Sequence, residues 1–218
     1  MEPERGYPTV FDLDETLADS AAAWNEAFGW IAARHGYLWT ARDWAAIQGH
    51  GVARWSRYVA GRCPGLTPQR AVTACTAWMV EAVAVGRVRP LRGAVELVAA
   101  AAGHGPVGLV SAAPCRYVLA VTGAFGLAPY FAVVVTGEDA TRGNSYLLAA
   151  SRLGVAPERC LAVEDSGWGV RSAHAAGMTV LAIPNPRTAL DADSLALATY
   201  RAADAVSAVG VLPGMAIA

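Results

Sequence analysis

Two aspartates near the start of the chain have the type and spacing for chemistry at a metal ion. Thr9, Val10 and Phe11 form a short apolar run that predicts a strand, and Asp12 and Asp14 follow it. Because alternate residues of a strand share a face, both carboxylates leave the strand end on roughly the same side. Carboxylates this close repel each other unless a partner neutralises them. Mg²⁺, which prefers hard oxygen ligands, is the expected partner; the alternative is an acidic turn after an edge strand.

Three later segments also place small polar or acidic residues next to apolar runs. In chain order they are Leu109-Val110-Ser111-Ala112-Ala113, Thr136-Gly137-Glu138-Asp139-Ala140-Thr141-Arg142-Gly143 and Cys160-Leu161-Ala162-Val163-Glu164-Asp165-Ser166. Together with Phe11-Asp12-Leu13-Asp14-Glu15-Thr16-Leu17, they resemble the four ordered motifs of the haloacid dehalogenase (HAD) superfamily of phosphotransferases. The resemblance runs from about Tyr7 to about Pro186. It points to the β-phosphoglucomutase-like phosphatase branch, which carries a helical cap.

The resemblance implies a mechanism through an aspartyl phosphate. Asp12 matches the family nucleophile, and Asp14 matches the general acid and base, whose backbone carbonyl is also a usual metal ligand. Asp165 matches a direct Mg²⁺ ligand, with Glu164 alongside or behind it. On the residues alone, Glu164-Asp165 could instead be an N-capping pair before the next helix.

The phosphoryl group of the substrate would be held by the loops after the first strands. Ser111 and the neighbouring amide of Ala112 match the second motif and would donate hydrogen bonds to the phosphoryl oxygens. Thr16 falls in the first motif and is expected near the substrate, with a hydrogen bond within the same loop; a structural role is an equal alternative.

The third motif departs from the family pattern. The usual text is a Gly-Lys-Pro run about four residues longer, and Asn144 falls at the lysine in simple register. All 17 basic residues of this chain are arginines. Arg142, just before a helix, resembles a shorter Lys-Gly form of the motif and is expected to supply the cation. Alternatively, Arg142 faces solvent and the cation is lost. If Arg142 does replace the lysine, the exchange is not neutral, because a guanidinium is a planar fork and an ammonium is a point charge.

The elements that must position these residues alternate between strand and helix from about Pro106 onward. The strands are expected at 107–110, 133–135, 161–163 and 179–183, and the helices at 94–102, 115–125, 145–153 and 170–176. This alternation predicts an α/β fold, a Rossmann-like, doubly wound parallel sheet. Ligands of such sheets bind beyond the carboxyl ends of the strands. A single crevice could therefore collect Asp12, Ser111, Thr136 and Asp165.

Residues 20–88 lack the strand–helix alternation and are predicted to form an inserted helical bundle. Amphipathic, alanine-rich stretches at 21–35, 41–47, 52–60 and 68–85 predict four helices. By resemblance this segment is the cap domain, and residues 1–19 and 89–218 form the core domain. Six of the seven tryptophans lie in it. They are most simply its core; one or two of them in the pocket would favour a larger or less polar substrate than a plain sugar phosphate.

Substrate recognition is expected from a glycine-containing loop between two of these helices. Gln48, Gly49 and His50 stand where relatives carry a specificity loop, and glycine lets such a loop reach into the crevice. For His50, a position in a surface loop without any role is an equal alternative.

Composition limits the classes of function. The chain of 218 residues is 55% hydrophobic and 16% charged, with a net charge of −1, which indicates a globular protein. A net charge this close to zero gives no sign of the basic surface that binds nucleic acid or an anionic membrane. No apolar run reaches the roughly 18–20 residues that span a bilayer, and no signal-peptide pattern is present, so a cytoplasmic monomer or homodimer is expected.

These expectations combine into a Mg²⁺-dependent phosphatase acting on a small phosphorylated compound, a sugar- or polyol-type monoester. One alternative is a β-phosphoglucomutase-like mutase, which would return the phosphoryl group to a sugar. The other is a HAD-fold binding protein without turnover, because the third motif has no lysine.

Overall fold

The core of the computed structural model, which describes residues 6–139, 143–188, 190–215 and 217, is one parallel sheet. Its strand order is β5-β4-β1-β6-β7-β8, and every neighbouring pair is parallel. The strands are β1 (Thr9–Asp12), β4 (Val107–Val110), β5 (Phe131–Val135), β6 (Leu161–Glu164), β7 (Thr179–Ala182) and β8 (Tyr200–Arg201). β1 lies in the middle, between β4 and β6, so its carboxyl end meets the ends of both neighbours.

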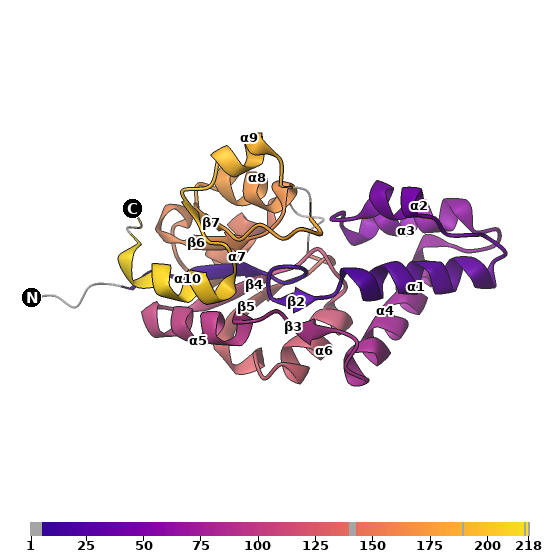
Figure 1. Ribbon diagram of the computed structural model, residues 1–218, viewed down its shortest axis with the longest axis horizontal. Helices are drawn as coiled ribbons and strands as arrows, with labels where there is room; N and C mark the ends of the chain where they lie inside the picture. Colours follow the sequence, from indigo (N-terminus) through magenta and orange to yellow (C-terminus); the bar gives the residue numbers. More distant parts are fainter. Residues whose placement is uncertain (1–5, 140–142, 189, 216, 218) are drawn as a thin grey trace, which may run out of the picture.

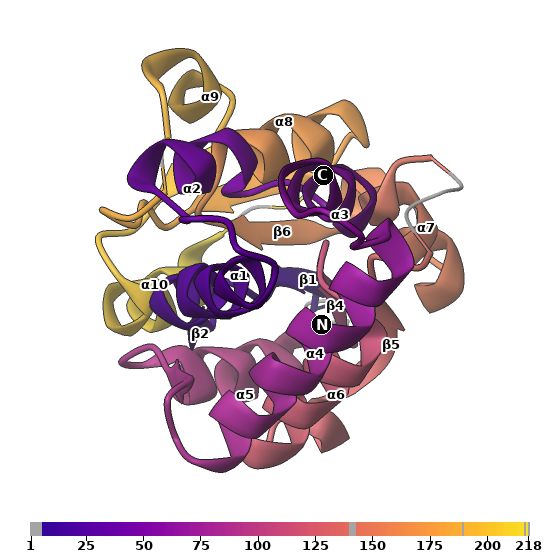
Figure 2. The same cartoon turned by 90° about the vertical axis from the view of Figure 1, so that its right-hand side faces the viewer.

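Helices cover both faces of this sheet (Figure 2). They are α5 (Ala94–His104) and α6 (Cys115–Ala124) on one face, α7 (Ser145–Leu153) and α8 (Gly167–Ala175) on the other, with α9 (Ala192–Ala196) and α10 (Ala205–Val211) near the end of the chain. Val10 and Phe11 are adjacent in β1 and fully buried, yet Val10 packs in the cluster of α7 and α8 and Phe11 in that of α5 and α6. Alternate residues thus face opposite layers, and the predicted doubly wound α/β fold is confirmed.

Four helices are inserted between two short antiparallel strands, β2 (Ala18–Asp19) and β3 (Arg89–Pro90). They are α1 (Ala21–Arg34), α2 (Ala41–Ile47), α3 (Val52–Arg62) and α4 (Pro68–Ala84), and they are called the helical insert below. The insert lies beyond the carboxyl ends of the sheet strands (Figure 1). No helix among the described residues is both long and apolar enough to cross a bilayer.

A tight loop after β1 joins the sheet to the helical insert. Glu15 has a left-handed backbone with φ of 66°. Its Oε1 accepts hydrogen bonds from the backbone N–H groups of Ser20 (2.9 Å) and Ala21 (2.8 Å), at the N-terminus of α1. A carboxylate at this end of a helix satisfies unpaired N–H groups and complements the helix dipole. The loop that carries Asp14 is therefore tied to the insert.

Candidate active site

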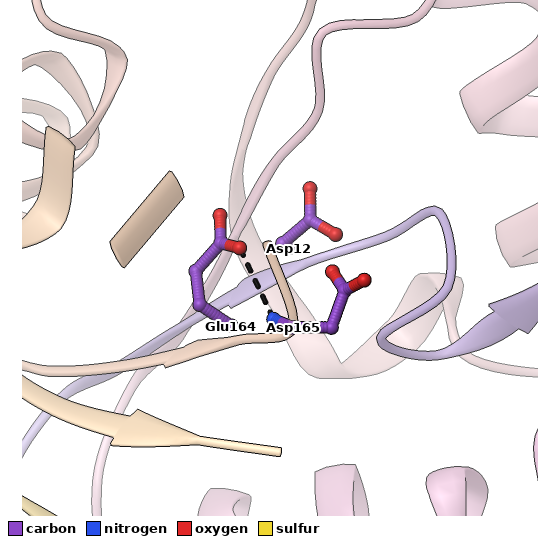
Figure 3. Close-up of side chains that lie close together, drawn as sticks. All are labelled: Asp12, Glu164 and Asp165. Atoms are coloured by element: carbon purple, nitrogen blue, oxygen red, sulfur yellow. Dashed lines mark hydrogen bonds between the residues drawn. The ribbon is translucent and has the colours of Figure 1, made fainter. Parts of the chain in front are cut away.

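Three carboxylates meet where β1 and β6 end side by side. Asp12 ends β1, Glu164 ends β6, and Asp165 is the next residue (Figure 3). One oxygen from each lies within 4.8 Å of the others. The parallel register pairs Phe11 with Val163, so the sheet itself brings together residues from distant parts of the chain.

The electrostatics of this cluster call for a cation. Burial, followed by the charges of Glu164, Asp165 and Asp14, raises the pKa of Asp12 well above its usual value. Burial and the neighbouring Glu164 raise the pKa of Asp165 to about 8. The Oδ2 atom of Asp165 is buried and has no hydrogen-bond partner within the described part of the chain. Hard oxygen ligands with an unpartnered, buried oxygen fit a Mg²⁺ ion.

Glu164 is held more firmly than its neighbours. Its Oε1 accepts a 2.5 Å hydrogen bond from the phenol of Tyr146, and its Oε2 accepts bonds from Asp165 N (3.1 Å), Ser166 N (3.2 Å) and Ser166 Oγ (3.1 Å). Gly169 lies against this carboxylate, because a Cβ there would come within 1.7 Å of Oε1. Sequence reasoning missed Tyr146 and Gly169 as partners of Glu164. Only the packing of α7 and α8 on β6 reveals both contacts.

The carboxylate of Asp14 does not join this cluster. Its Oδ1 accepts hydrogen bonds from Ser20 Oγ (2.7 Å), Trp24 Nε1 (3.2 Å) and Tyr117 OH (2.8 Å), and its Oδ2 accepts a 3.4 Å bond from Ser111 Oγ. Burial raises the pKa of Asp14, and these four donors oppose that rise. Two of the donors belong to the start of the helical insert. The role of the Asp14 backbone carbonyl as a metal ligand stays a prediction.

Three other residues expected in the crevice use their hydroxyls in hydrogen bonds to neighbouring protein groups. Thr16 is 1% exposed, and its Oγ1 donates a 2.8 Å hydrogen bond to Oδ1 of Asp165. Ser111 is 2% exposed and, besides its contact with Asp14, accepts a bond from the amide of Ala113 (3.1 Å). The hydroxyl of Thr136 bonds within its own turn. Thr16 and Ser111 therefore support two carboxylates of the site.

The residue that would supply the positive charge of the third motif is not assigned among the described residues. Arg142 lies outside the described residues. Asn144, at the lysine position in simple register, caps α7: its Oδ1 accepts from Tyr146 N (2.9 Å) and Leu147 N (3.4 Å). Among the described residues that line the cavity, the arginines are Arg54 and Arg57 of α3.

A cavity of about 640 Å³ opens between the carboxylates and the helical insert. Gln48, Gly49, His50 and Ala112 line it. Their role in substrate binding stays a prediction. The Nε2 of Gln48 also donates a hydrogen bond to the carbonyl of Arg187, which links the insert to the loop after β7. Burial and the charge of Arg54 lower the pKa of His50.

The family of this chain follows from its sequence and fold together. A model of the haloacid dehalogenase-like hydrolases matches residues 9–177, which include all three clustered carboxylates. The chain belongs to the haloacid dehalogenase-like hydrolases. The predicted membership of this HAD superfamily, and of its β-phosphoglucomutase-like branch, is confirmed.

Relatives extend this likeness over nearly the whole chain. Protein CbbY of Rhodobacter capsulatus is 28% identical and covers 94% of this chain and 97% of its own. Hexitol phosphatase A of Escherichia coli is 33% identical and covers 81% of this chain and 82% of its own. A crystal structure of CbbY from Rhodobacter sphaeroides in complex with phosphate has a TM-score of 0.81 at 25% identity and covers 92% of this chain and 95% of its own.

Proposed function

We propose that this HAD hydrolase is a Mg²⁺-dependent phosphatase that hydrolyses a small organic phosphate monoester, of the sugar or polyol type, through an aspartyl phosphate. The observation that carries the proposal is the clustering of Asp12, Glu164 and Asp165 within 4.8 Å at the edge of the cavity. Relatives named as hexitol phosphatase and fructose-1-phosphate phosphatase support the substrate class.

In the first step, a carboxylate oxygen of Asp12 attacks phosphorus and the bond from phosphorus to the leaving oxygen breaks. Asp14 donates its proton to that oxygen, so the alcohol leaves neutral. In the second step, water attacks the aspartyl phosphate while Asp14 takes its proton, which restores Asp12 and releases inorganic phosphate. The raised pKa of Asp14 suits a group that must be protonated in the first step.

The metal ion would be held by Asp12 and Asp165, with Glu164 beside them. When bound, Mg²⁺ neutralises the carboxylates and the developing charge on the phosphoryl oxygens. Thr16 orients Asp165 through its hydroxyl. The hydrogen bonds from Tyr146 and Ser166 fix the carboxylate of Glu164.

The helical insert would act as the cap domain, residues 20–88, on a core of residues 1–19 and 89–218. It contributes Gln48 and His50 to the cavity wall and two hydrogen bonds to Asp14. A cap that covers the carboxylates excludes bulk water during transfer. It also couples substrate binding to the placement of the general acid.

A panel of phosphate monoesters tests the proposal. Wild-type protein should release inorganic phosphate with Mg²⁺ and stop when EDTA removes the ion. Asp12→Asn should lower kcat by about 10³-fold or more, because amides are poor nucleophiles. Asp193→Asn, the same change at an exposed residue of α9, is the matched control and should keep wild-type kcat.

Rapid quenching with ³²P-labelled substrate tests the covalent step. Wild-type protein should carry a hydroxylamine-labile label that Asp12→Asn lacks. Hydrolysis that persists in Asp12→Asn at the wild-type rate would refute the mechanism. Isomerised sugar phosphate in place of free phosphate would identify a mutase. Binding without either product would indicate a binding protein, the alternative favoured by the absence of lysine.

A further inference from the structure

An exposed tryptophan stands at the mouth of the cavity. Trp168, the second residue of α8, lines the cavity with 66% of its surface exposed. Large aromatic side chains usually bury most of their surface, so an exposed one in a concave site marks a surface for a ligand. Trp168 lies three residues after Asp165, and its side chain lines the same cavity as the carboxylate cluster.

A second ring faces Trp168 from the helical insert. His50, in the loop between α2 and α3, lies with its ring centroid 6.0 Å from that of Trp168 and an interplanar angle of 62°. Both rings line the cavity. Rings at this separation and angle make an edge-to-face pair, which leaves ring surface uncovered for a further planar ring.

Four further aromatic residues contribute to the wall of the same cavity. Trp24, Phe28, Trp44 and Trp55 of the helical insert line the same cavity. They pack on one another, with Phe28 5.7 Å from Trp24 and 5.2 Å from Trp55 between centroids. Aromatic side chains form few hydrogen bonds with the hydroxyls of a bare polyol, whereas they pack well on a flat apolar ring.

We infer that the leaving group of the natural substrate carries a planar aromatic ring, which packs against Trp168 and His50 while the phosphate lies at Asp12 and Asp165. The inference rests on the proposed phosphatase function and narrows its substrate class. It points to phosphate monoesters in which a sugar or alkyl chain joins the phosphate to the ring, such as a nucleoside monophosphate or an arylalkyl phosphate. Among the proposed sugar- or polyol-type monoesters, one that also carries such a ring should then be preferred over one that lacks it.

Two pairs of monoesters with chemically similar leaving oxygens test the inference. The first pair is 2-phenylethyl phosphate and 2-cyclohexylethyl phosphate, which differ in the aromaticity of the ring. The second is adenosine 5′-monophosphate and ribose 5-phosphate, which differ in the base. The wild-type protein should give a kcat/KM about tenfold higher for the aromatic member of at least one pair. The pair that shows the preference identifies the kind of ring.

Trp168→Ala and Trp168→Leu should both reduce this preference to within twofold, since leucine keeps apolar volume but no ring. Trp30→Ala is the matched control. Trp30 is likewise exposed (41%), but it lies on α1 outside the residues that line this cavity, so the preference should stay. Circular dichroism checks that each variant folds.

Equilibrium binding gives a readout that does not need turnover. 2-Phenylethylphosphonate should bind the wild-type protein with Mg²⁺ about tenfold more tightly than ethylphosphonate in calorimetry, and Trp168→Ala should remove the difference. Equal kcat/KM within both pairs, or a preference that survives both substitutions of Trp168, would overturn the inference. In that case, hydrolysis that still requires Asp12 and Mg²⁺ would leave the proposed function standing.

Discussion

At the scale of single residues, Glu164 is the best-supported carboxylate of the cluster that it forms with Asp12 and Asp165. Its two oxygens accept four hydrogen bonds, which fix the carboxylate in position. Burial raises the pKa of Glu164, and the hydrogen bonds from Tyr146, Ser166 and Asp165 oppose that rise. Tyr146 supplies the bond that comes from outside the β6–α8 turn. Burial and the charge of Glu164 raise the pKa of Tyr146 well above its usual value, so its phenol remains a neutral donor. Tyr146 therefore orients Glu164 without supplying the positive charge that a lysine would bring.

Removing that donor should weaken metal binding. Tyr146→Phe leaves Oε1 of the buried Glu164 without its partner. Groups that orient metal ligands typically change affinity by 10–100-fold, so the Kd for Mg²⁺ in calorimetry should rise by about tenfold. Tyr130→Phe, at an exposed tyrosine, is the control and should keep the wild-type Kd. An unchanged Kd in Tyr146→Phe would show that Glu164 needs no such support.

Gly169 is the second residue on which Glu164 depends. In Gly169→Ala the new methyl group would lie 1.7 Å from Oε1, so the carboxylate or the start of α8 must move. We expect a loss of about 1–3 kcal/mol in the free energy of unfolding, together with weaker Mg²⁺ binding.

Urea titration with and without Mg²⁺ measures both effects. Gly103→Ala in α5 is the matched control, because a Cβ there meets nothing within 4 Å. It should instead stabilise the protein by about 0.5–1 kcal/mol, since alanine loses less backbone entropy in a helix. Wild-type stability and Mg²⁺ affinity in Gly169→Ala would contradict the proposed packing.

At the scale of elements, α2 owes its position to one buried carboxylate. Asp43 is 3% exposed; its Oδ1 accepts from the phenols of Tyr37 and Tyr58 (both 2.9 Å), and its Oδ2 accepts from Thr40 N (2.9 Å) and Oγ1 (2.6 Å). Thr40 and Asp43 together form a capping box at the start of α2. The loop with His50 begins where α2 ends. The Asp43 network thus anchors one wall of the cavity.

This network predicts a pH-dependent contribution to stability. Burial tends to raise the pKa of Asp43, but the hydrogen bonds from Thr40, Tyr37 and Tyr58 outweigh it and lower the pKa below the usual value. An acid whose pKa is lower in the folded state stabilises the fold above its unfolded pKa of about 3.9. That contribution is lost as pH falls through the folded pKa.

Asp43→Asn should therefore lose about 1.5–3 kcal/mol of unfolding free energy at pH 7. The difference from wild type should shrink at pH 3 and below, because the wild-type carboxylate is then becoming protonated. Urea titrations at both pH values measure it, with Asp193→Asn as the exposed control. A difference that stays constant with pH would show that the charge of Asp43 contributes nothing.

Some helices and strands could be predicted from their own residues, and others could not. The helices at 41–47 and 145–153 were predicted with their observed bounds, and in the structure the side chains of Thr40 and Asn144 cap their starts. β2, β3 and β8 were not predicted. Each is only two residues long and is defined by its pairing with another strand.

At the scale of the whole molecule, the carboxylate cluster is destabilising without a cation. Asp12, Glu164 and Asp165 are assembled only when β1 and β6 pair, so an ion that binds them binds the folded chain alone. The cluster proposed to support catalysis would therefore also couple metal binding to stability.

Saturating Mg²⁺ should raise the melting temperature. At a concentration of 100 times Kd the stabilisation is about 2.7 kcal/mol, and a chain of this size gains about 2–4 °C per kcal/mol. Differential scanning calorimetry should show a rise of about 5–10 °C in wild type and Asp193→Asn. Asp165→Asn should show almost none. An equal rise in Asp165→Asn would place the ion elsewhere.

The sequence by itself determined the parts of this protein that depend on near neighbours. Four short motifs, which resemble those of the HAD superfamily, pointed to the family, and the local patterns of the apolar run before Asp12 and the strand–helix alternation sufficed for the fold class. They also brought Asp12, Glu164 and Asp165 to one sheet edge, because parallel strands end on the same side.

Only the tertiary structure decided which side chain contacts which. The bond from Tyr146 to Glu164, the four donors to Asp14 and the pairing of His50 with Trp168 join separate elements. No periodicity records such contacts, since they depend on the packing of whole helices against the sheet and against one another.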